Sequence, residues 1–201
     1  MMRLYYSPGA CSLTQHILLC MSGMEFSVER VDLKTKQTEH KRDFREVNPH
    51  GQVPTLELDN HTILTENIAI AQYIADKTPS ANLIAPVGHD DRYQTLSWLS
   101  YVATELHKAY GPIFKSSVQA EKDAAIKVLE DKFQALDARL KDRKFIATES
   151  FTIADAYLYV VLRWRKIIPN LPSYPAIDSF MQRVESLPAV QQALKQEGLM
   201  A

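Results

Sequence analysis

The sequence has few of the features that mark specialised classes of protein. Only two of its 201 residues are cysteines, and the spacing of Cys11 and Cys20 fits neither a disulfide framework nor the Cys-x-x-Cys pattern of redox and zinc sites. The longest uninterrupted apolar run, residues 156–162, is far shorter than the roughly 20 residues that a membrane-spanning helix needs. The 23 basic and 24 acidic side chains leave a formal charge of −1, without the basic excess typical of nucleic-acid binders. We therefore expect no membrane partner, no nucleic-acid partner and only single-thiol roles for the cysteines.

The composition that remains is that of an ordinary globular protein, with 46% hydrophobic and 23% charged residues. A chain of this length buries roughly 70% of its unfolded surface, which is enough for a substantial core. Pro8 and Gly9 interrupt the place where a signal peptide would need an apolar stretch, so we expect a cytoplasmic protein, with the periplasm as the alternative. Cys11 does not share a helical face with His16 and Cys20, so no metal site is expected.

The first 78 residues alternate short strand-like runs with helical stretches, which predicts an α/β domain. A helix beginning near Leu13 is expected to end at Gly23, and a second helix is predicted over residues 66–76. The predicted strands are residues 3–6, 27–31, 55–58 and 62–64, and the last two form an antiparallel hairpin.

Residues 79–88 contain two prolines and no periodicity, and we place the domain linker there. Beyond it the sequence predicts an all-α domain over residues 89–201. Thr152 and Asp155 have the spacing of a helix N-terminal capping pair, for which a folding role is expected. The predicted helices are residues 90–110, 119–140, 153–168, 174–186 and 189–196.

Cys11 follows a strand and a Pro-Gly turn at the start of a helix. Unpaired backbone N–H groups and the helix dipole favour a thiolate in that position, which predicts a reactive cysteine. The alternative is a small buried hydrophobic residue, and this interpretation suits Cys20 on the apolar face of the same helix.

Two further segments indicate recognition of a peptide-like ligand. The Val53-Pro54 bond precedes a strand, where a cis bond would turn the Val53 backbone outward to pair with an extended peptide; an ordinary turn is the alternative. Glu66 and Asn67 begin a helix, so a carboxylate, an amide and helix N–H groups could bind an α-amino acid group. Helix capping is the alternative for this pair.

Five segments together resemble the bacterial beta-class glutathione transferases, and the resemblance runs essentially from end to end. The segments are Leu4-Tyr5-Tyr6-Ser7-Pro8-Gly9-Ala10-Cys11-Ser12-Leu13, residues 47–54, Leu64-Thr65-Glu66-Asn67, Glu105-Leu106-His107-Lys108 and Thr152-Ile153-Ala154-Asp155. The resemblance implies a thioredoxin-like N-terminal domain followed by an all-α helical domain, assembled as a homodimer. It also implies that glutathione is a co-substrate, that hydrophobic electrophiles are the second substrates, and that no cofactor is tightly bound.

The resemblance assigns the sulfur chemistry to two residues. The counterpart of Cys11 lies beside the glutathione sulfur and can hold glutathione as a mixed disulfide, and the counterpart of His107 lies near the same sulfur. Ser100, Thr104 and His107 share one helical face by their spacing, apart from the apolar line of Leu99, Val102 and Leu106. His107 would then be a hydrogen-bonding partner or a proton acceptor for a thiol.

The remaining assignments also follow from the resemblance. Lys36 would contact the glycine end of glutathione, Val53 with its neighbours Gln52 and Pro54 the cysteinyl backbone, and Glu66 and Asn67 the γ-glutamyl head. Ser100, Thr104 and Glu105 are further glutathione-binding candidates, and the last two would reach the tripeptide of the partner subunit. Asn67 and Ser100 depart from the residues common in the family but remain hydrogen-bonding. The electrophile site would be formed by Tyr110, Phe114 and Trp164, for which core packing is the alternative.

These observations predict a detoxifying enzyme that transfers the glutathione thiolate to electrophilic carbon. Thiol–disulfide exchange through Cys11 is a second reaction that the same residues allow. A glutathione-dependent isomerase or dehalogenase would share every glutathione contact and differ only in the second pocket. A glutathione-binding or ligand-carrying protein with little turnover is the remaining alternative.

Overall fold

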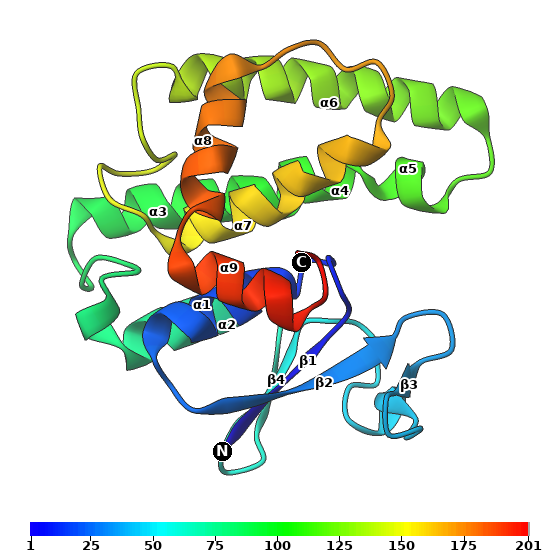
Figure 1. Ribbon diagram of the computed structural model, residues 1–201, viewed down its shortest axis with the longest axis vertical. Helices are drawn as coiled ribbons and strands as arrows, with labels where there is room; N and C mark the ends of the chain where they lie inside the picture. Colours follow the sequence, from blue (N-terminus) through cyan, green and yellow to red (C-terminus); the bar gives the residue numbers. More distant parts are fainter. Residues whose placement is uncertain (201) are drawn as a thin grey trace. The chain divides into compact units, whose positions relative to one another are not determined.

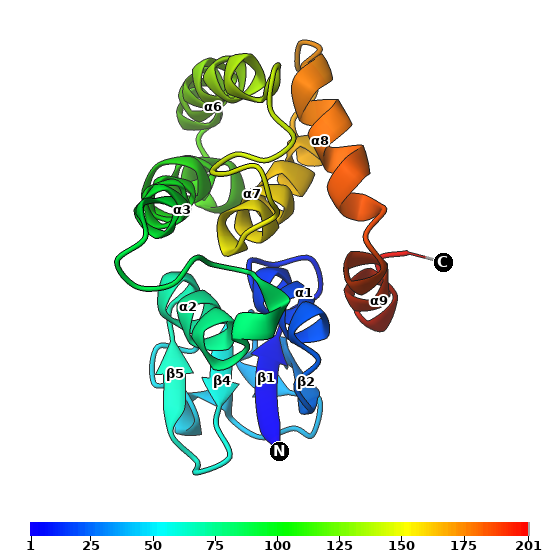
Figure 2. The ribbon, with the colours of Figure 1, turned by 90° about the vertical axis from the view of Figure 1, so that its left-hand side faces the viewer.

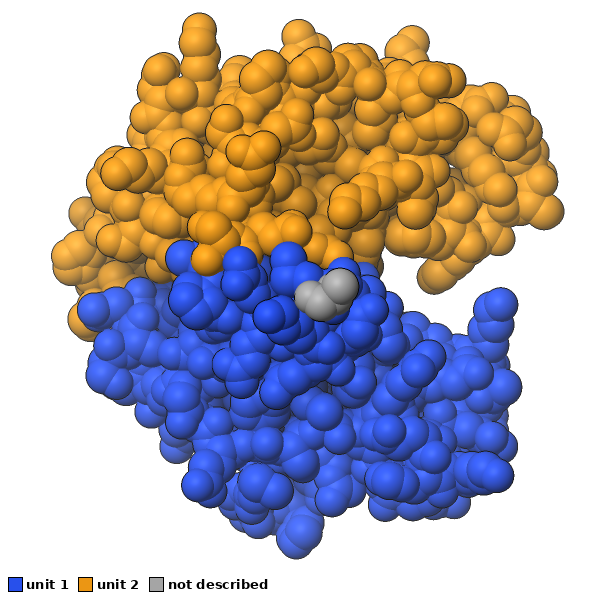
Figure 3. All heavy atoms as spheres, in the orientation of Figure 1, with its two compact units in different colours: residues 1–84, 187–201 blue, residues 85–186 orange. Residues whose placement is uncertain are grey.

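The computed structural model describes residues 1–200 and divides the chain into two compact units. Unit 1 consists of Met1–Ile84 together with Leu187–Ala201, and unit 2 consists of Ala85–Ser186 (Figures 1 and 3). The boundary after Ile84 falls inside the predicted linker, residues 79–88. The assignment of all residues 89–201 to the helical domain is wrong for the last segment, which returns to unit 1.

Unit 1 is built on a five-stranded mixed sheet in the order β3-β2-β1-β4-β5. The central strand β1 pairs in parallel with β2 and antiparallel with β4, and β4 forms the predicted antiparallel hairpin with β5 (Figure 2). The strands are β1 (Met2–Tyr6), β2 (Phe26–Asp32), β3 (Gln37–Thr38), β4 (Thr55–Glu57) and β5 (Ile63–Thr65). The predicted α/β domain is therefore confirmed.

Two helices lie side by side along this sheet, α1 (Leu13–Ser22) and α2 (Asn67–Lys77) (Figure 2). The helix α1 ends at Gly23, whose φ of 70° is the left-handed conformation that a glycine adopts without steric cost. Two short 3₁₀ turns lie in the connections of this unit. One is η1 (Phe44–Glu46), between β3 and β4, and the other is η2 (Pro79–Ala81), after α2. The turn η1 contributes Phe44 to a buried cluster with Tyr5, Val31 and Val53.

The C-terminal helix α9 (Pro188–Gln196) belongs to unit 1 because it packs against α1. Its apolar face is buried, and the carboxylate of Glu197 just beyond it accepts a hydrogen bond from the Gly9 N–H at 2.9 Å. The same carboxylate lies 3.0 Å from Nδ1 of His16, and both side chains are fully buried. Burial of Val190, Ala193 and Leu194 against α1 stabilises this placement, and the hydrogen bonds of Glu197 offset the cost of burying its carboxylate.

All regular elements of unit 2, within residues 85–186, are helices, as predicted. The predicted helix 90–110 is divided by one π-helical turn, because the chain forms α3 (Asp90–Tyr101), η3 (Val102–Leu106) and α4 (His107–Ala109). The other elements are α5 (Gly111–Lys115), α6 (Gln119–Leu140), α7 (Ile153–Arg163), the 3₁₀ turn η4 (Trp164–Ile167) and α8 (Pro175–Glu185). Within residues 1–200, no helix combines the length and the apolar character required to cross a membrane.

The start of α7 is fixed by the predicted capping pair. Asp155 accepts hydrogen bonds from the backbone N–H and the hydroxyl of Thr152, both at 2.9 Å, and from the Ile146 N–H at 2.7 Å. Asp155 is fully buried, and burial raises its pKa to about 6 although these hydrogen bonds favour the charged carboxylate. The whole of α7 up to Leu162 is buried, so this cap holds the central helix of unit 2.

We predict that Asp155→Ala lowers the free energy of unfolding by about 2 to 4 kcal/mol, because it removes the cap and leaves buried N–H donors without a partner. The measurement is the urea midpoint at a fixed protein concentration. The control is Glu149→Ala, which truncates an exposed carboxylate in the loop just before α7 and should leave the midpoint unchanged. Equal midpoints for the two variants would contradict the structural role of Asp155.

Candidate active site

Cys11 lies in the turn that joins β1 to α1. Backbone hydrogen bonds from Ala10 to Ser7 and from Leu13 to Ala10, each 3.0 Å long, close this turn just before the helix begins. The half-buried thiol of Cys11 donates a hydrogen bond to the carbonyl of Val53 at 3.3 Å. Two segments that are 42 residues apart in the sequence therefore meet at the Cys11 sulfur.

The electrostatics of this thiol differ from the sequence-based expectation. Burial raises the pKa of Cys11 to about 11. The Asn67 side chain and the N–H groups of Cys11 and Ser12 favour the thiolate, but they do not offset burial, and the nearby charge of Glu66 raises the pKa further. The helix start alone predicted a thiolate, whereas burial favours the neutral thiol, because loss of hydration outweighs the helix-end donors.

The Val53-Pro54 bond is cis, as predicted. The segment before it is held by the buried Asn48, whose amide donates to the Gln52 carbonyl and to the Thr55 hydroxyl, both at 2.9 Å. Gln52 itself is exposed, whereas the Val53 side chain is buried and its carbonyl faces the Cys11 thiol. The backbone beside Cys11 is thus fixed before β4 begins.

Glu66 and Asn67 form the junction between β5 and α2. Glu66 has a φ of 69°, a left-handed conformation that is uncommon for a residue other than glycine and that occurs often at functional sites. Its side chain is exposed, and its charge acts on the Cys11 thiol. The Asn67 carbonyl accepts a hydrogen bond from Gln15 on α1 at 3.1 Å. The start of α2 is therefore anchored beside the Cys11 turn.

Lys36 contacts Gly51, in the segment that leads to Val53. Its ammonium donates to the carbonyl of Gly51 at 2.8 Å, and its stem lies so close to Gly51 that a Cβ there would come within 3.1 Å of the Lys36 Cδ. A side chain at position 51 would displace Lys36. The structure thus brings Lys36, Gln52, Val53, Pro54, Cys11, Glu66 and Asn67 to one region of unit 1.

A separate aromatic cluster forms in unit 2 around Trp164. The ring of Trp164 lies 5.3 Å from that of Tyr110, 5.4 Å from that of Phe114 and 4.8 Å from the imidazole of His107. Phe114 is 52% exposed, while Tyr110 is fully buried. The structure therefore brings together the three predicted electrophile-site residues and His107, with Phe114 open to solvent.

His107 is held by a residue that the sequence did not reveal. Its Nδ1 lies 2.6 Å from the hydroxyl of Tyr157 on α7. Burial lowers the pKa of His107 to about 4, and the charges of Lys115 and Lys108 lower it further. The imidazole is therefore neutral near pH 7. Tyr157 sits within the apolar run of α7, where its spacing indicated only core packing.

Ser100, Thr104 and Glu105 are all exposed on α3 and η3. The Thr104 hydroxyl donates to the Ser100 carbonyl at 3.0 Å, and Glu105 pairs with Lys132 at 3.1 Å. The α-helical spacing used for Ser100, Thr104 and His107 does not hold across this π turn, which adds a residue to the helix. The predicted apolar line remains, because Leu99, Val102 and Leu106 are all fully buried.

Comparison with known proteins identifies the family. The glutathione S-transferase N-terminal domain matches residues 9–77, and the glutathione S-transferase C-terminal domain matches residues 93–188. The chain belongs to the glutathione S-transferase family. Glutathione S-transferase GstA of Escherichia coli O157:H7 is 48% identical over 200 residues, which covers 98% of this chain and all of that protein. The predicted activity, glutathione transfer, is therefore confirmed.

Solved structures of this transferase family agree with the fold. The bacterial beta-class enzyme of Sphingomonas chungbukensis is 42% identical with a TM-score of 0.95, and the match covers 98% of this chain and all of that one. A sphingomonad glutathione S-transferase complexed with glutathione is 43% identical with a TM-score of 0.94, covering 98% of this chain and 99% of that one. The predicted thioredoxin-like and helical domains and the beta-class resemblance are confirmed.

The raised pKa of Cys11 predicts slow alkylation of the unliganded transferase. In a Cys20→Ser variant, the rate constant with iodoacetamide at pH 7 should be about 100-fold below that of an ordinary thiol, since two pKa units change the thiolate fraction by that factor. The rate should rise tenfold per pH unit up to pH 9.5. N-acetylcysteine under the same conditions is the control, and a plateau below pH 8 would contradict a buried, protonated thiol.

Proposed function

We propose that this transferase binds glutathione through unit 1 and hydrophobic electrophiles through the aromatic cluster of unit 2. The observation that carries the proposal is the convergence of three segments on one sulfur. The Cys11 turn, the Val53 carbonyl and the start of α2 meet where a tripeptide could pair with backbone at its centre and with charges at its ends.

Each part of glutathione has a matching group in this proposal. The Val53 backbone pairs with the cysteinyl residue, Glu66 binds the γ-glutamyl ammonium, and Asn67 with the α2 N-terminus binds the γ-glutamyl carboxylate. Lys36, supported by Gly51, binds the glycine carboxylate. Gln52 is exposed beside the Val53 backbone and Pro54 follows it, so both line the same edge.

In the proposed reaction, Cys11 acts as a hydrogen-bond donor. The glutathione thiolate attacks the electrophilic carbon, a carbon–sulfur bond forms, and the leaving group departs with the bonding electrons. A protonated Cys11 can donate its S–H to that thiolate and lower the pKa of the bound glutathione thiol. The raised pKa of Cys11 favours this role over direct attack on a disulfide, which requires the Cys11 thiolate. We assign the neutral His107 as a second hydrogen-bonding group for the sulfur.

The aromatic cluster favours aryl or other flat hydrophobic electrophiles. The rings of Tyr110 and Phe114 are stacked, with centroids 5.9 Å apart, and Phe114 exposes part of its ring for a substrate to stack upon. Conjugation is favoured over ligand carriage because the sulfur-binding groups and this surface both occur in one chain. Isomerase and dehalogenase reactions would use the same glutathione contacts.

We also propose that the enzyme is a homodimer in the cytoplasm. The support is the resemblance to the beta class, together with the exposure of Thr104 and Glu105, which are available to reach the glutathione of a partner subunit. The single ion pair of Glu105 with Lys132 lies at the surface and contributes little to folding.

The experiment that tests the glutathione assignment is Glu66→Gln. We predict that KM for glutathione rises about 10- to 100-fold, because a charge pair with the substrate ammonium is lost. The kcat at saturating glutathione should change little, since that ammonium does not react. The measurement is steady-state conjugation of an aryl halide.

The matched control is Glu25→Gln, which neutralises an exposed carboxylate just before β2 and should leave both constants unchanged. A large loss of kcat in Glu66→Gln with an unaltered KM would show that Glu66 does not bind the substrate as proposed.

A further inference from the structure

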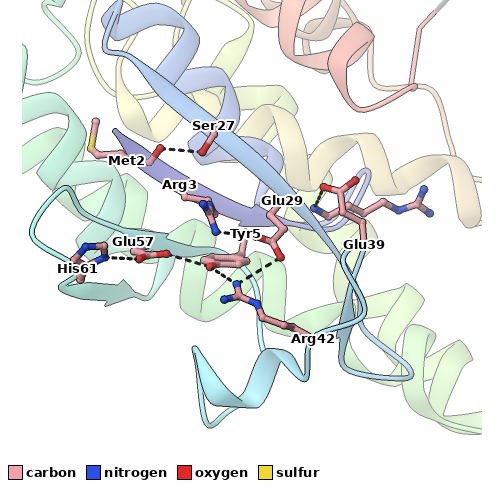
Figure 4. Close-up of polar contacts among 10 residues, drawn as sticks. Met2, Arg3, Tyr5, Ser27, Glu29, Glu39, Arg42, Glu57 and His61 are labelled. Atoms are coloured by element: carbon pink, nitrogen blue, oxygen red, sulfur yellow. Dashed lines mark hydrogen bonds and ion pairs between the residues drawn. The ribbon is translucent and has the colours of Figure 1, made fainter.

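A charged network surrounds the hydroxyl of Tyr5 on one face of the sheet of unit 1 (Figure 4). The Tyr5 hydroxyl accepts a hydrogen bond from the Arg42 guanidinium at 3.0 Å and donates one to the Glu57 carboxylate at 3.1 Å. Glu29, beside Tyr5 in the register of β1 and β2, pairs with Arg3 at 3.1 Å and with Arg42 at 3.5 Å. One phenol therefore links β1, β4 and the turn that carries Arg42.

The ring of Tyr5 links the same strand to the segments that flank the proposed glutathione site. It is fully buried and lies 5.3 Å from the ring of Phe44, in the cluster that also contains Val53. Ala10, next to Cys11, packs against this cluster. The Val53 carbonyl in turn accepts a hydrogen bond from the Cys11 thiol at 3.3 Å.

The backbone of Lys36 is also connected to the Tyr5 cluster, through Phe44. Its backbone carbonyl accepts a hydrogen bond from the N–H of Phe44 at 2.8 Å, and Thr38 donates to the carbonyl of Arg42 at 2.9 Å. The segment from Lys36 to Phe44 therefore folds back on itself. Two charged side chains join this segment to the sheet: Arg42 contacts Tyr5 and Glu29, and the Glu39 carboxylate accepts a hydrogen bond from the backbone N–H of Arg30 on β2 at 2.9 Å (Figure 4).

The charges make the Tyr5 hydroxyl important for the position of Arg42. The Glu29 side chain is only 3% exposed, and a buried carboxylate needs cationic partners. Arg42 reaches Glu29 only at 3.5 Å, whereas its contact with Tyr5 is 3.0 Å long. Since a long ion pair fixes geometry less than a short hydrogen bond, removal of the hydroxyl should loosen the Arg42 turn.

We propose that Tyr5 is a positioning residue for glutathione binding, which sets the geometry of Lys36 and Val53 without touching the substrate. This inference rests on the proposed function of those two residues. Loss of the hydroxyl should weaken the glutathione contacts of the Lys36 segment while the sulfur chemistry at Cys11 continues. The proposal therefore predicts a change in KM for glutathione with little change in kcat.

The test is Tyr5→Phe, with Tyr159→Phe as a matched control. Tyr159 has the same arrangement in unit 2: a fully buried ring, and a hydroxyl that accepts from Arg163 and donates to Glu185, both at 2.9 Å. We expect Tyr5→Phe to raise KM for glutathione about 3- to 10-fold, with kcat within about 2-fold of wild type. Tyr159→Phe should leave KM unchanged although both variants lose a buried hydrogen bond.

A second variant keeps the proposal testable if Tyr5→Phe folds poorly. Arg42 is about half exposed, so Arg42→Ala should fold, and it should raise KM for glutathione to a similar extent. In the double variant the two effects should not add, because they remove one interaction. Full additivity, or an unchanged KM in both single variants, would overturn the proposal.

Binding of S-methylglutathione separates this inference from the proposed function. If the wild-type protein does not bind it in calorimetry, both fail. If the wild-type protein binds and Glu66→Gln binds weakly, while Tyr5→Phe and Arg42→Ala bind like wild type, the site stands and the positioning role of Tyr5 is wrong. The expected result is weakened binding by Tyr5→Phe and Arg42→Ala and unchanged binding by Tyr159→Phe.

Discussion

The turn between β1 and α1 is held by two acceptors from remote parts of the chain. The Val53 carbonyl accepts a hydrogen bond from the Cys11 thiol, and the Glu197 carboxylate accepts one from the Gly9 N–H at 2.9 Å. The segment with the cis bond after Val53 positions the first acceptor, and the packing of α9 on α1 positions the second. The Cys11 turn therefore depends on the middle of unit 1 and on the C-terminal segment. The Cys11 turn is thus preorganised by backbone contacts, which reduces the cost of ordering it when a substrate binds.

This arrangement also sets the chemical state of the cysteine. A half-buried thiol that donates its hydrogen to a carbonyl stays protonated near pH 7, because burial raises its pKa to about 11. In that state it is a poor nucleophile and a good donor to an anionic sulfur. The imidazole of His107, with a pKa lowered to about 4, is likewise neutral. Near pH 7 each of these two groups is therefore neutral and acts through hydrogen bonds rather than through a charge of its own.

Local patterns in the sequence predicted most of the helices and strands and the backbone around Val53, because strands, caps and turns depend on neighbouring residues. The cap at Thr152 and the cis bond at Val53 are of this kind. The placement of α9 could not be predicted, because it depends on a carboxylate pairing with groups about 180 residues away. The raised pKa of Cys11 and the contacts of Tyr5 depend on burial and cross-strand register, which periodicity does not give.

In the proposed function, unit 1 binds the backbone and the γ-glutamyl end of glutathione. The most direct measurement is the change in backbone amide NMR signals of the ¹⁵N-labelled protein on addition of S-methylglutathione, which binds without reacting. We predict that the largest changes occur at Cys11, Val53, Glu66 and Asn67. Saturating ligand that shifts only signals of unit 2, or that leaves the Val53 and Asn67 amides unchanged, would contradict it.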